Sequence, residues 1–206
     1  GRRAASSHTG SIAGRAEIYG AVFKGAGVIA AADTEEFFDL TTVLDACASN
    51  LPSNDGAAII TISGGPSVAA SDACEEHGLE VPRLSEATVE RLKSLMADFA
   101  APLNPVDMTP QTDPANYRAV VDTVLDEPGV GGLIAINVGL DHELFGEAFA
   151  SGKEKHGKPI VACTLDTPKI DACFAQAGIP VFPTPERAVK AYRGLVRYRR
   201  IRQRGA

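Results

Sequence analysis

Short apolar runs that alternate with helical patterns are the feature that most constrains the fold of this chain. The runs have the length of strands, and we expect strands at 28–31, 57–62, 79–81, 132–137, 159–164 and 179–182. Helices are expected at 12–24, 34–49, 67–77, 86–99, 114–126, 141–155, 168–177 and 185–202. Runs that are apolar throughout are typical of parallel strands buried on both faces. The sequence therefore predicts an α/β fold with a doubly wound parallel sheet.

Capping residues and glycines mark the ends of the predicted helices. Asp113, Thr167 and Thr184 each precede a proline, which suits the first turn of a helix because its missing N–H needs no partner there. Asp33 and Glu36 have the spacing of a capping box. Glycines, which adopt the left-handed conformation most easily, are expected to end four helices, at Gly27, Gly78, Gly157 and Gly178.

A polar, turn-rich stretch, NLPSNDG at residues 50–56, divides the chain. The residues before it hold only one predicted strand, too little for a core of their own. We therefore expect residues 1–50 to be the C-terminal part of one domain and residues 56–206 to form a second, flavodoxin-like domain. The chain begins at Gly1 rather than Met, so we expect it to be a fragment.

Composition excludes several classes of protein. Hydrophobic residues make up 45% of the chain and charged residues 22%, which excludes a disordered chain. No apolar run approaches the 18 or so residues of a membrane-spanning helix. The four cysteines have no metal-ligand spacing, so they predict buried thiols in a reducing compartment, the cytoplasm.

The charge of the chain is distributed unevenly. Eight of the 20 Lys and Arg residues lie between residues 187 and 204, a segment without acids, and the other 12 face all 26 Asp and Glu residues. An acidic body argues against a nucleic-acid binder. The basic segment could bind phosphate, but a solvated terminal helix is the simpler interpretation.

The loops that follow strands are the first candidates for a site, because ligands of such sheets bind outside the carboxyl ends of the strands. One of these loops reads SGGPS at residues 63–67. Its glycines let the backbone approach an anion, and the following helix start supplies free N–H groups. A plain tight turn explains the pattern about as well, and the chain has neither GxGxxG nor GxxxxGK[ST].

Three further loops contain candidate residues. LNPVDM at residues 103–108 contains Asn, Pro and Asp in an order that is common in turns. In the loop at 137–142, His142 is most simply the exposed start of a helix. His8 lies among small hydroxyl residues and glycines, which suits an imidazole that reaches other groups as a nucleophile. Composition alone favours an incidental histidine at that position.

Four stretches of the sequence resemble one enzyme family. They read SSHTGSIAGRAEIYGAVFKGAGVI at 6–29, ISGGPSVAASDACEEHGLEVPRLS at 62–85, LNPVDMTP at 103–110 and AGIPVFPTPERAVKAYRGLVRYRR at 177–200. In this order they are similar to the phosphohistidine segment and ligase domain of NDP-forming acyl-CoA synthetases, relatives of succinyl-CoA synthetase. The resemblance covers nearly the whole chain. It implies a flavodoxin-like ligase-CoA domain, preceded by the C-terminal part of a second such domain.

The resemblance implies an acid-thiol ligase that interconverts acyl-CoA, ADP and phosphate with a carboxylic acid, CoA and ATP. The reaction passes through an acyl phosphate and a phosphohistidine, and His8 would accept the phosphoryl group. The other residues implied are Ser7, Thr9, Gly10 and Ser11, which shape the loop, Gly64, Gly65, Pro66 and Ser67 at the phosphate, and Asn104 and Asp107 in the adjacent loop. Neutral imidazole is a good nucleophile near pH 7.

The family's CoA-binding domain and its ATP-grasp domain are not in this sequence, so we expect them as partner domains or subunits. CoA and ATP or ADP with Mg²⁺ would be substrates of the complete enzyme. We expect no tightly bound cofactor or metal on this chain, no membrane and an oligomer. In succinyl-CoA synthetase the loop corresponding to 137–142 is glycine-rich, whereas only Gly139 remains here.

Two other functions compete with the ligase. One is a non-catalytic regulatory or sensor module of the same fold, as in ligase-like domains attached to protein acetyltransferases. The intact SHTGS around His8 argues against such degeneracy. The other is a plain flavodoxin-like binding module, which predicts aromatic stacking loops, yet aromatic residues are 6% of the chain and Trp is absent.

Overall fold

The computed structural model describes residues 16–204 of the chain. The strands are β1 Ala57–Thr61, β2 Ala101–Pro102, β3 Val106–Asp107, β4 Gly132–Val138, β5 Ile160–Leu165 and β6 Val181–Phe182. The helices are α2 Ala16–Gly25, α3 Thr34–Cys47, α4 Gly64–Glu76, α5 Glu86–Lys93, α6 Tyr117–Leu125, α7 Glu143–His156, α8 Pro168–Gln176 and α9 Pro185–Arg204, with the short 3₁₀ helix η1 at Pro114–Asn116.

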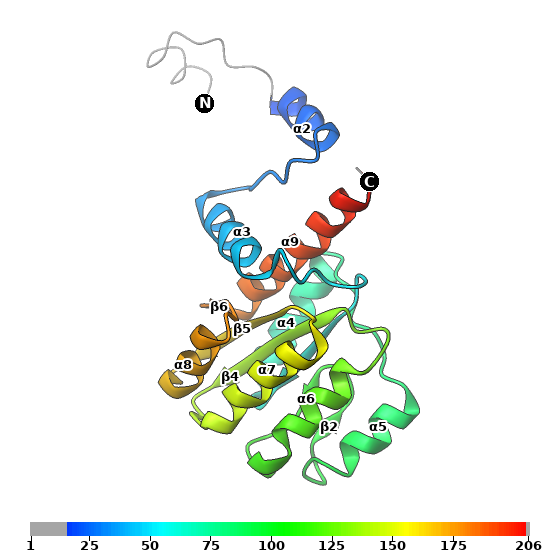
Figure 1. The fold of residues 1–206 in the computed structure, drawn as a ribbon, viewed down its shortest axis with the longest axis vertical. Coiled ribbons are helices and arrows are strands. Elements are labelled where there is room, and N and C mark those ends of the chain that lie inside the picture. The colour runs from blue at the N-terminus through cyan, green and yellow to red at the C-terminus, as the bar shows by residue number, and fades with distance from the viewer. Residues whose placement is uncertain (1–15, 205–206) are drawn as a thin grey trace.

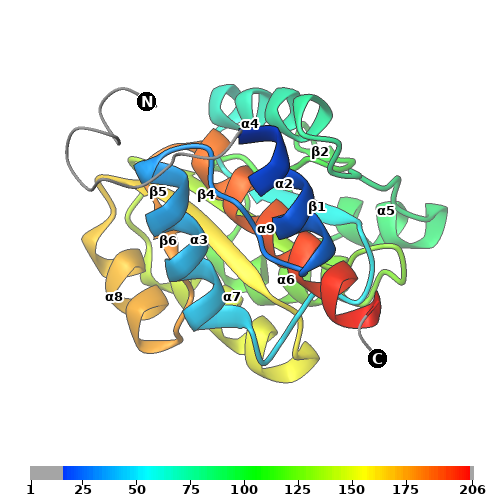
Figure 2. The same cartoon turned by 90° about the horizontal axis from the view of Figure 1, so that it is seen from above.

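The six strands form one sheet in the order β2-β3-β1-β4-β5-β6. Every neighbouring pair is parallel except β2 with β3 at the edge. Helices cover both faces of this sheet (Figures 1 and 2). The predicted α/β fold with a doubly wound, mostly parallel sheet is therefore confirmed.

The side chains of the central strand β4 pack into two different cores. Its Ile134 and Ile136 side chains pack with residues of α3, α4 and α9 on one face. Its Leu133 and Ala135 side chains pack with residues of α5 to α8 on the other face. Because both faces are covered, the strand is apolar from Leu133 to Ile136, which is the pattern that the sequence displayed.

Most predicted helix ends are confirmed by their geometry. Gly27, Gly78, Gly157 and Gly178 all have φ between 62° and 69°. Asp33 caps α3, accepting the Glu36 N–H at 2.7 Å, and the Glu36 carboxylate accepts the N–H of Ala32, one residue earlier than a capping box expects. Thr167 forms no capping hydrogen bond. The Asp141 carboxylate instead accepts the N–H of Lys169 at 3.0 Å from a neighbouring loop.

Three predicted elements differ from the structure, and two short strands were not predicted. Residues 28–31 form no strand, and residues 79–81 contribute only an isolated bridge between Gly56 and Glu80. Helix α5 ends at Lys93 rather than near residue 99, and β2 and β3 lie in the proline-rich loop where no strand was expected. An apolar run becomes a strand only where another strand offers its N–H and C=O groups, and residues 28–31 have none among the described residues.

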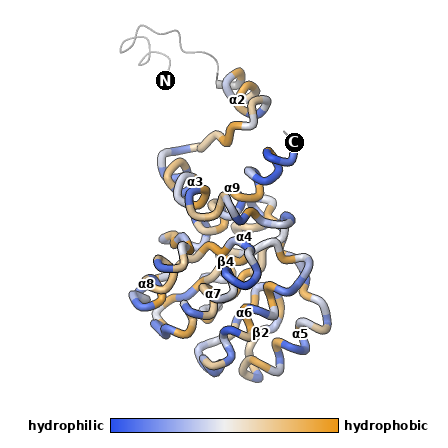
Figure 3. The backbone as a smooth tube through the Cα atoms, viewed as in Figure 1, coloured by the Kyte–Doolittle hydropathy of each residue, from blue (hydrophilic) through white to orange (hydrophobic). Residues whose placement is uncertain are grey.

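Helix α9 is not the solvated terminal helix that its charge predicted. Its first half is buried in the core through Val189, Tyr192 and Leu195, and its Tyr192 hydroxyl donates to the Gly56 carbonyl at 3.2 Å. Only the C-terminal end of the helix is mostly hydrophilic (Figure 3). The sequence prediction failed here because the arginines are spaced so that a narrow apolar stripe between them faces the sheet.

Helix α3 belongs to the same hydrophobic core. Its Leu40, Val43 and Cys47 side chains are buried, the last two among residues of β1, β4 and α9. Helix α2 behaves differently and exposes Ile18 and Val22 by more than half of their surface. The division of the chain at residues 50–56 stays a prediction.

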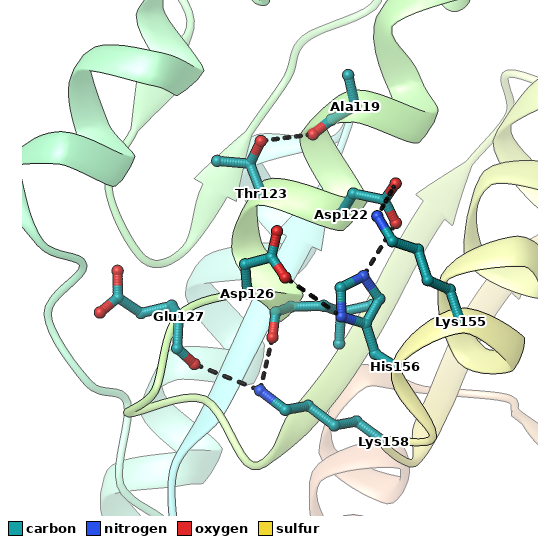
Figure 4. A network of polar contacts seen from close by, with 9 residues as sticks. Ala119, Asp122, Thr123, Asp126, Glu127, Lys155, His156 and Lys158 are labelled. Atoms are coloured by element: carbon teal, nitrogen blue, oxygen red, sulfur yellow. Dashed lines mark hydrogen bonds and ion pairs between the residues drawn. The ribbon is translucent and has the colours of Figure 1, made fainter.

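The ends of α6 and α7 are joined by a polar network on the opposite side of the sheet (Figure 4). The Asp122 carboxylate accepts from Lys155 at 2.9 Å and lies 3.1 Å from the His156 ring nitrogen. Lys158 donates to the carbonyls of Leu125 and Glu127 at the C-terminal end of α6. Carbonyls at a helix end have no partner within the helix, so this lysine completes the end of α6.

No helix among residues 16–204 is long and apolar enough to cross a membrane.

Candidate functional site

The candidate site lies where the chain leaves the sheet in opposite directions. The segment after β1 enters α4 on one face, and the segment after β4 enters α7 on the other face. Ligands of doubly wound sheets bind at such a switch point, outside the carboxyl ends of the strands. The two loops meet there, because the Ser63 hydroxyl donates to the Val138 carbonyl at 3.4 Å.

The N-terminus of α4 is open at this edge. The helix begins at Gly64, three residues earlier than predicted, and Ser63 before it is extended and forms no side-chain capping hydrogen bond. Gly64 and Gly65 are exposed, and a Cβ added to Gly65 would meet nothing within 4 Å. The first turn contains no acid. These features leave free N–H groups and a positive helix end accessible to an anion.

Pro66 and Ser67 complete the first turn of α4. Pro66 is the third residue of the helix, where a missing N–H still removes no helical hydrogen bond. The Ser67 side chain is buried, and its hydroxyl donates to the Gly64 carbonyl at 2.7 Å. Thr61 holds the turn from the other side, because its hydroxyl oxygen accepts the Ser63 N–H at 2.8 Å.

Asp107 reaches the same turn from the neighbouring strand β3. A Cβ added to Gly64 would lie 3.2 Å from its Oδ2 atom. Its other oxygen, Oδ1, accepts the N–H of Thr109 at 2.9 Å. Thr109 has a φ of 58°, a conformation that a β-branched residue rarely adopts. The structure therefore brings Asp107 and Gly64 together, although 43 positions of sequence separate them.

Asn104 lies away from that turn, toward the amino half of β1. Its side-chain oxygen accepts the Ile59 N–H at 2.9 Å, and its amide donates to the Ala57 and Pro82 carbonyls at 3.1 and 3.0 Å. These three bonds attach the start of the loop to the sheet. The predicted pair Asn104 and Asp107 thus touches β1 at two separate places.

The C-terminal end of β4 contributes a residue that the sequence did not single out. Asn137 is wholly buried, and neither of its side-chain polar atoms has a hydrogen-bond partner among the described residues. Buried polar groups without partners are rare in native proteins. A polar residue directly after the apolar run LIAI was the available signal. Gly139 follows with a φ of 80° and an open approach.

His142 caps a helix, as its simplest interpretation predicted. Its Nδ1 atom accepts the Leu144 N–H at 3.3 Å at the start of α7. Its ring lies edge-on to that of Tyr117, with centroids 6.2 Å apart. Burial, with a smaller effect from Asp113, raises the pKa of Tyr117 above its ordinary value, so the phenol keeps its proton at neutral pH.

One group of predicted site residues cannot be compared with this geometry. His8 and its neighbours Ser7, Thr9, Gly10 and Ser11 lie outside the described residues.

The described residues contain no evident metal site. No three His, Cys, Asp or Glu side chains among residues 16–204 form a group that could hold an ion. The cysteines are free, and Cys173 is the only one of the four that is partly exposed.

Family comparisons agree with this arrangement. Residues 57–163, just over half of the chain, match the model of the Ligase-CoA domain, which includes α4 and both loops at its N-terminus. The chain belongs to the Ligase-CoA domain family. Residues 1–44 match the model of the succinyl-CoA ligase-like flavodoxin domain. The resemblance stated from the sequence motifs is therefore confirmed.

Individual relatives carry ligase names. The chain is 34% identical to the α subunit of ADP-forming acetate–CoA ligase II of Pyrococcus furiosus, over 95% of this chain and 44% of that protein. It is also 34% identical to ADP-forming acetate–CoA ligase I of Archaeoglobus fulgidus, over 98% of this chain and 29% of that protein. The chain thus spans less than half the length of these relatives.

A solved structure shows the same fold. It is described as a dinucleotide-forming acetyl-coenzyme A synthetase 1 of Ca. Korarchaeum cryptofilum in complex with phosphate and ADP. The two chains share 28% identity and superpose with a TM-score of 0.86, which covers 98% of this chain and 45% of the other.

Proposed function

We propose that this Ligase-CoA chain is part of an NDP-forming acyl-CoA synthetase, an acid-thiol ligase. The observation that carries the proposal is the open N-terminus of α4 at the switch point between β1 and β4. Relatives named as ligases support it over a regulatory module of the same fold. The phosphate in the solved structure of the Ca. Korarchaeum cryptofilum synthetase supports an anion as one of the ligands.

The proposed reaction runs in three steps. Phosphate oxygen attacks the thioester carbonyl of acyl-CoA, so that the C–S bond breaks and an acyl phosphate and CoA form. A ring nitrogen of His8 then attacks the phosphorus, and the carboxylate leaves. Finally an oxygen of the terminal phosphate of ADP takes the phosphoryl group from the histidine, which gives ATP. Each step moves one acyl or phosphoryl group and is reversible.

In this reaction α4 would stabilise the phosphate and the acyl phosphate. The backbone N–H groups of Gly64 and Gly65 supply donors and a helix dipole without the cost of a positive side chain. Pro66 and Ser67 keep the first turn rigid, since the Ser67 hydroxyl binds the Gly64 carbonyl. Asp107 borders the same turn, and Asn104 anchors its loop to β1.

The remaining substrates are proposed to bind on partner domains or subunits. A CoA-binding domain and an ATP-grasp domain are expected because the chain covers less than half of its relatives. We place Mg²⁺ with the nucleotide, because proteins usually bind this ion through substrate phosphates. An oligomer and a cytoplasmic location complete the proposal, and the four free thiols support the latter.

The test compares two substitutions at Gly65 in the complete enzyme. Gly65→Asp places a negative charge at the helix end and is expected to raise the KM for phosphate at least tenfold. Gly65→Ala is the matched control, because an added Cβ meets nothing within 4 Å there, and it should leave that KM within twofold. If Gly65→Asp leaves the phosphate KM unchanged, α4 does not bind the phosphate.

A further inference from the structure

A groove with a volume of about 310 Å³ lies between α2 and the last turns of α9. Figures 1 and 2 both show α2 beside the C-terminal end of α9. A Cβ added to Gly27, which follows α2, would lie 2.9 Å from Ile201 Cγ2 of α9, so the two segments touch directly. Small-molecule sites in proteins begin at about this volume. The groove is therefore large enough to hold a small ligand.

Basic side chains line the groove on both sides. Arg197, Arg200 and Arg204 line it from α9, and their spacing of three and four residues places them on one face of that helix. Lys24 lines it from the last turn of α2. None of the described residues that line the groove is acidic. Four cations from two helices therefore border the same space.

Neighbouring acids neutralise only part of this positive charge. Arg197 lies 4.0 Å from Glu36, and Arg200 is paired with an acid in the segment that precedes β1. Lys24 and Arg204 form no ion pair with any of residues 16–204. Cations that converge without counter-charges attract anions. The groove thus has the electrostatic character of an anion site.

The groove also has an apolar wall, which a turn at the end of α2 builds. The Val28 N–H donates to the Phe23 carbonyl at 2.8 Å, and Gly27 between them has a φ of 69°. Such a turn usually brings the two flanking side chains into contact. Phe23 and Val28 are nevertheless 38% and 48% exposed, and both line the groove together with Ile201. A ligand with an apolar or aromatic part would cover them.

The groove is separate from the candidate phosphate site. Arg200 pairs with Asp55, which precedes β1 and therefore lies at the amino edge of the sheet. Helix α4 begins after β1, at the carboxyl edge. The two sites thus lie at opposite edges of the sheet, and a small ligand in the groove does not reach the N-terminus of α4.

We propose that this groove binds an organic phosphate, an anion that carries an aromatic or apolar group. Lys24 and Arg204 donate hydrogen bonds to the phosphate oxygens, and the aromatic or apolar group packs on Phe23 and Val28. Adenosine phosphates have this chemistry, and they include both free nucleotides and the adenosine-phosphate end of CoA. The inference assigns a role to the basic last turns of α9, which the proposed ligase reaction does not use.

The test uses the complete enzyme and an ADP analogue that carries a photoreactive azido group on the adenine ring. After illumination, the labelled peptides are identified by mass spectrometry, so that a second nucleotide site elsewhere in the enzyme does not interfere. We expect label within residues 18–30 or 197–204. Excess ADP or excess CoA should prevent it, and the more effective of the two identifies the source of the ligand. Adenosine, which has no phosphate, should not prevent it.

Two charge reversals on α9 provide the matched comparison. Arg204→Glu should lower the label in these two segments at least fivefold, because Arg204 lines the groove. Arg202→Glu changes the net charge equally, but Arg202 does not line the groove, so the label should stay within twofold of wild type. Both side chains are exposed, so both variants are expected to fold. Phe23→Ala should lower the label at least threefold through the lost apolar contact.

Three results would overturn the inference. They are the absence of label from both segments, label that adenosine prevents as well as ADP and CoA do, and an equal loss of label in the two charge reversals. The proposed function is tested separately, by the phosphate KM of the Gly65 variants. A groove that is labelled as expected in an enzyme without ligase activity would leave this inference intact and contradict only the proposed function.

Discussion

Residues 57–204 and residues 16–55 differ in how they bury their apolar side chains. In the first region every residue of β1 is buried, and helices cover both faces of the sheet. In the second, α3 packs on α9, whereas α2 lies apart from the sheet (Figure 1) and its Ile18 and Val22 side chains are more than half exposed. The second region joins the core of the first through Val43 and Cys47 of α3, whereas the apolar side chains of α2 are largely exposed.

We expect the two regions to contribute differently to the proposed reaction. The sheet presents the open end of α4 on a rigid framework, which suits a site that must hold an anion in one place. The segment that contains His8 precedes the less buried region, which suits a group that must reach more than one site. Stability and phosphoryl transfer are therefore expected to respond to changes in different parts of the chain.

The largest effect on stability is expected from the core of the first region. Ile134 of β4 is 0% exposed, so Ile134→Ala should lower the free energy of unfolding by about 2–5 kcal/mol. Ile18→Ala in α2, where the side chain is 58% exposed, should change it by less than about 0.5 kcal/mol. Urea unfolding of both variants measures the contrast. Equal losses would contradict the difference between the regions.

The contact between α3 and α9 gives an intermediate effect. Gly194→Ala forces Leu40 aside and should cost about 1–3 kcal/mol by overpacking. Gly20→Ala in α2 meets nothing within 4 Å and should stabilise the helix by about 0.5–1 kcal/mol, because alanine favours helix over glycine. Thermal melting of the two variants shows whether each substitution raises or lowers the stability. A stabilising Gly194→Ala would show that the helices are not closely packed.

The smallest effect concerns Asp55, whose carboxylate accepts hydrogen bonds from Arg199 and Arg200, and this effect depends on pH. Its pKa is lowered in the folded chain, first by the Arg200 hydrogen bond, so the stabilisation is fully present above the ordinary aspartate pKa of about 3.9 and is lost as the pH falls through the folded value. Asp55→Asn should therefore cost about 0.5–1 kcal/mol at about pH 6, a value reduced by solvent screening. The difference from wild type should shrink toward about pH 3. A difference that does not change with pH would exclude the carboxylate as its source.

Much of the fold could be predicted because its signals are local. Gly78 and Gly157 end helices in the left-handed conformation that their position required, and Asp113 caps η1 as its place before a proline predicted. The apolar run at residues 57–62 has neighbours on both sides and forms β1. The run at 28–31 is equally apolar but forms no strand, because pairing depends on what lies beside it rather than on the run itself.

The candidate site could be predicted only in part, because it combines residues that are distant in the sequence. The SGGPS turn was visible as a helix start with glycines, and α4 does begin there. The approach of Asp107 to Gly64 follows from the pairing of β3 with β1, a contact that a two-residue strand in a proline-rich loop did not reveal. Thr167 does not cap α8 as predicted, and Asp141 from another loop accepts the Lys169 N–H instead.

The most direct test of the account is the intact mass of the complete enzyme after incubation with ATP and Mg²⁺, compared with the His8→Ala variant. The account predicts that the wild type gains one acid-labile phosphoryl group and that the variant gains none. A wild-type enzyme without this gain, or a variant that retains it, would contradict the assignment of His8 as the phosphoryl carrier.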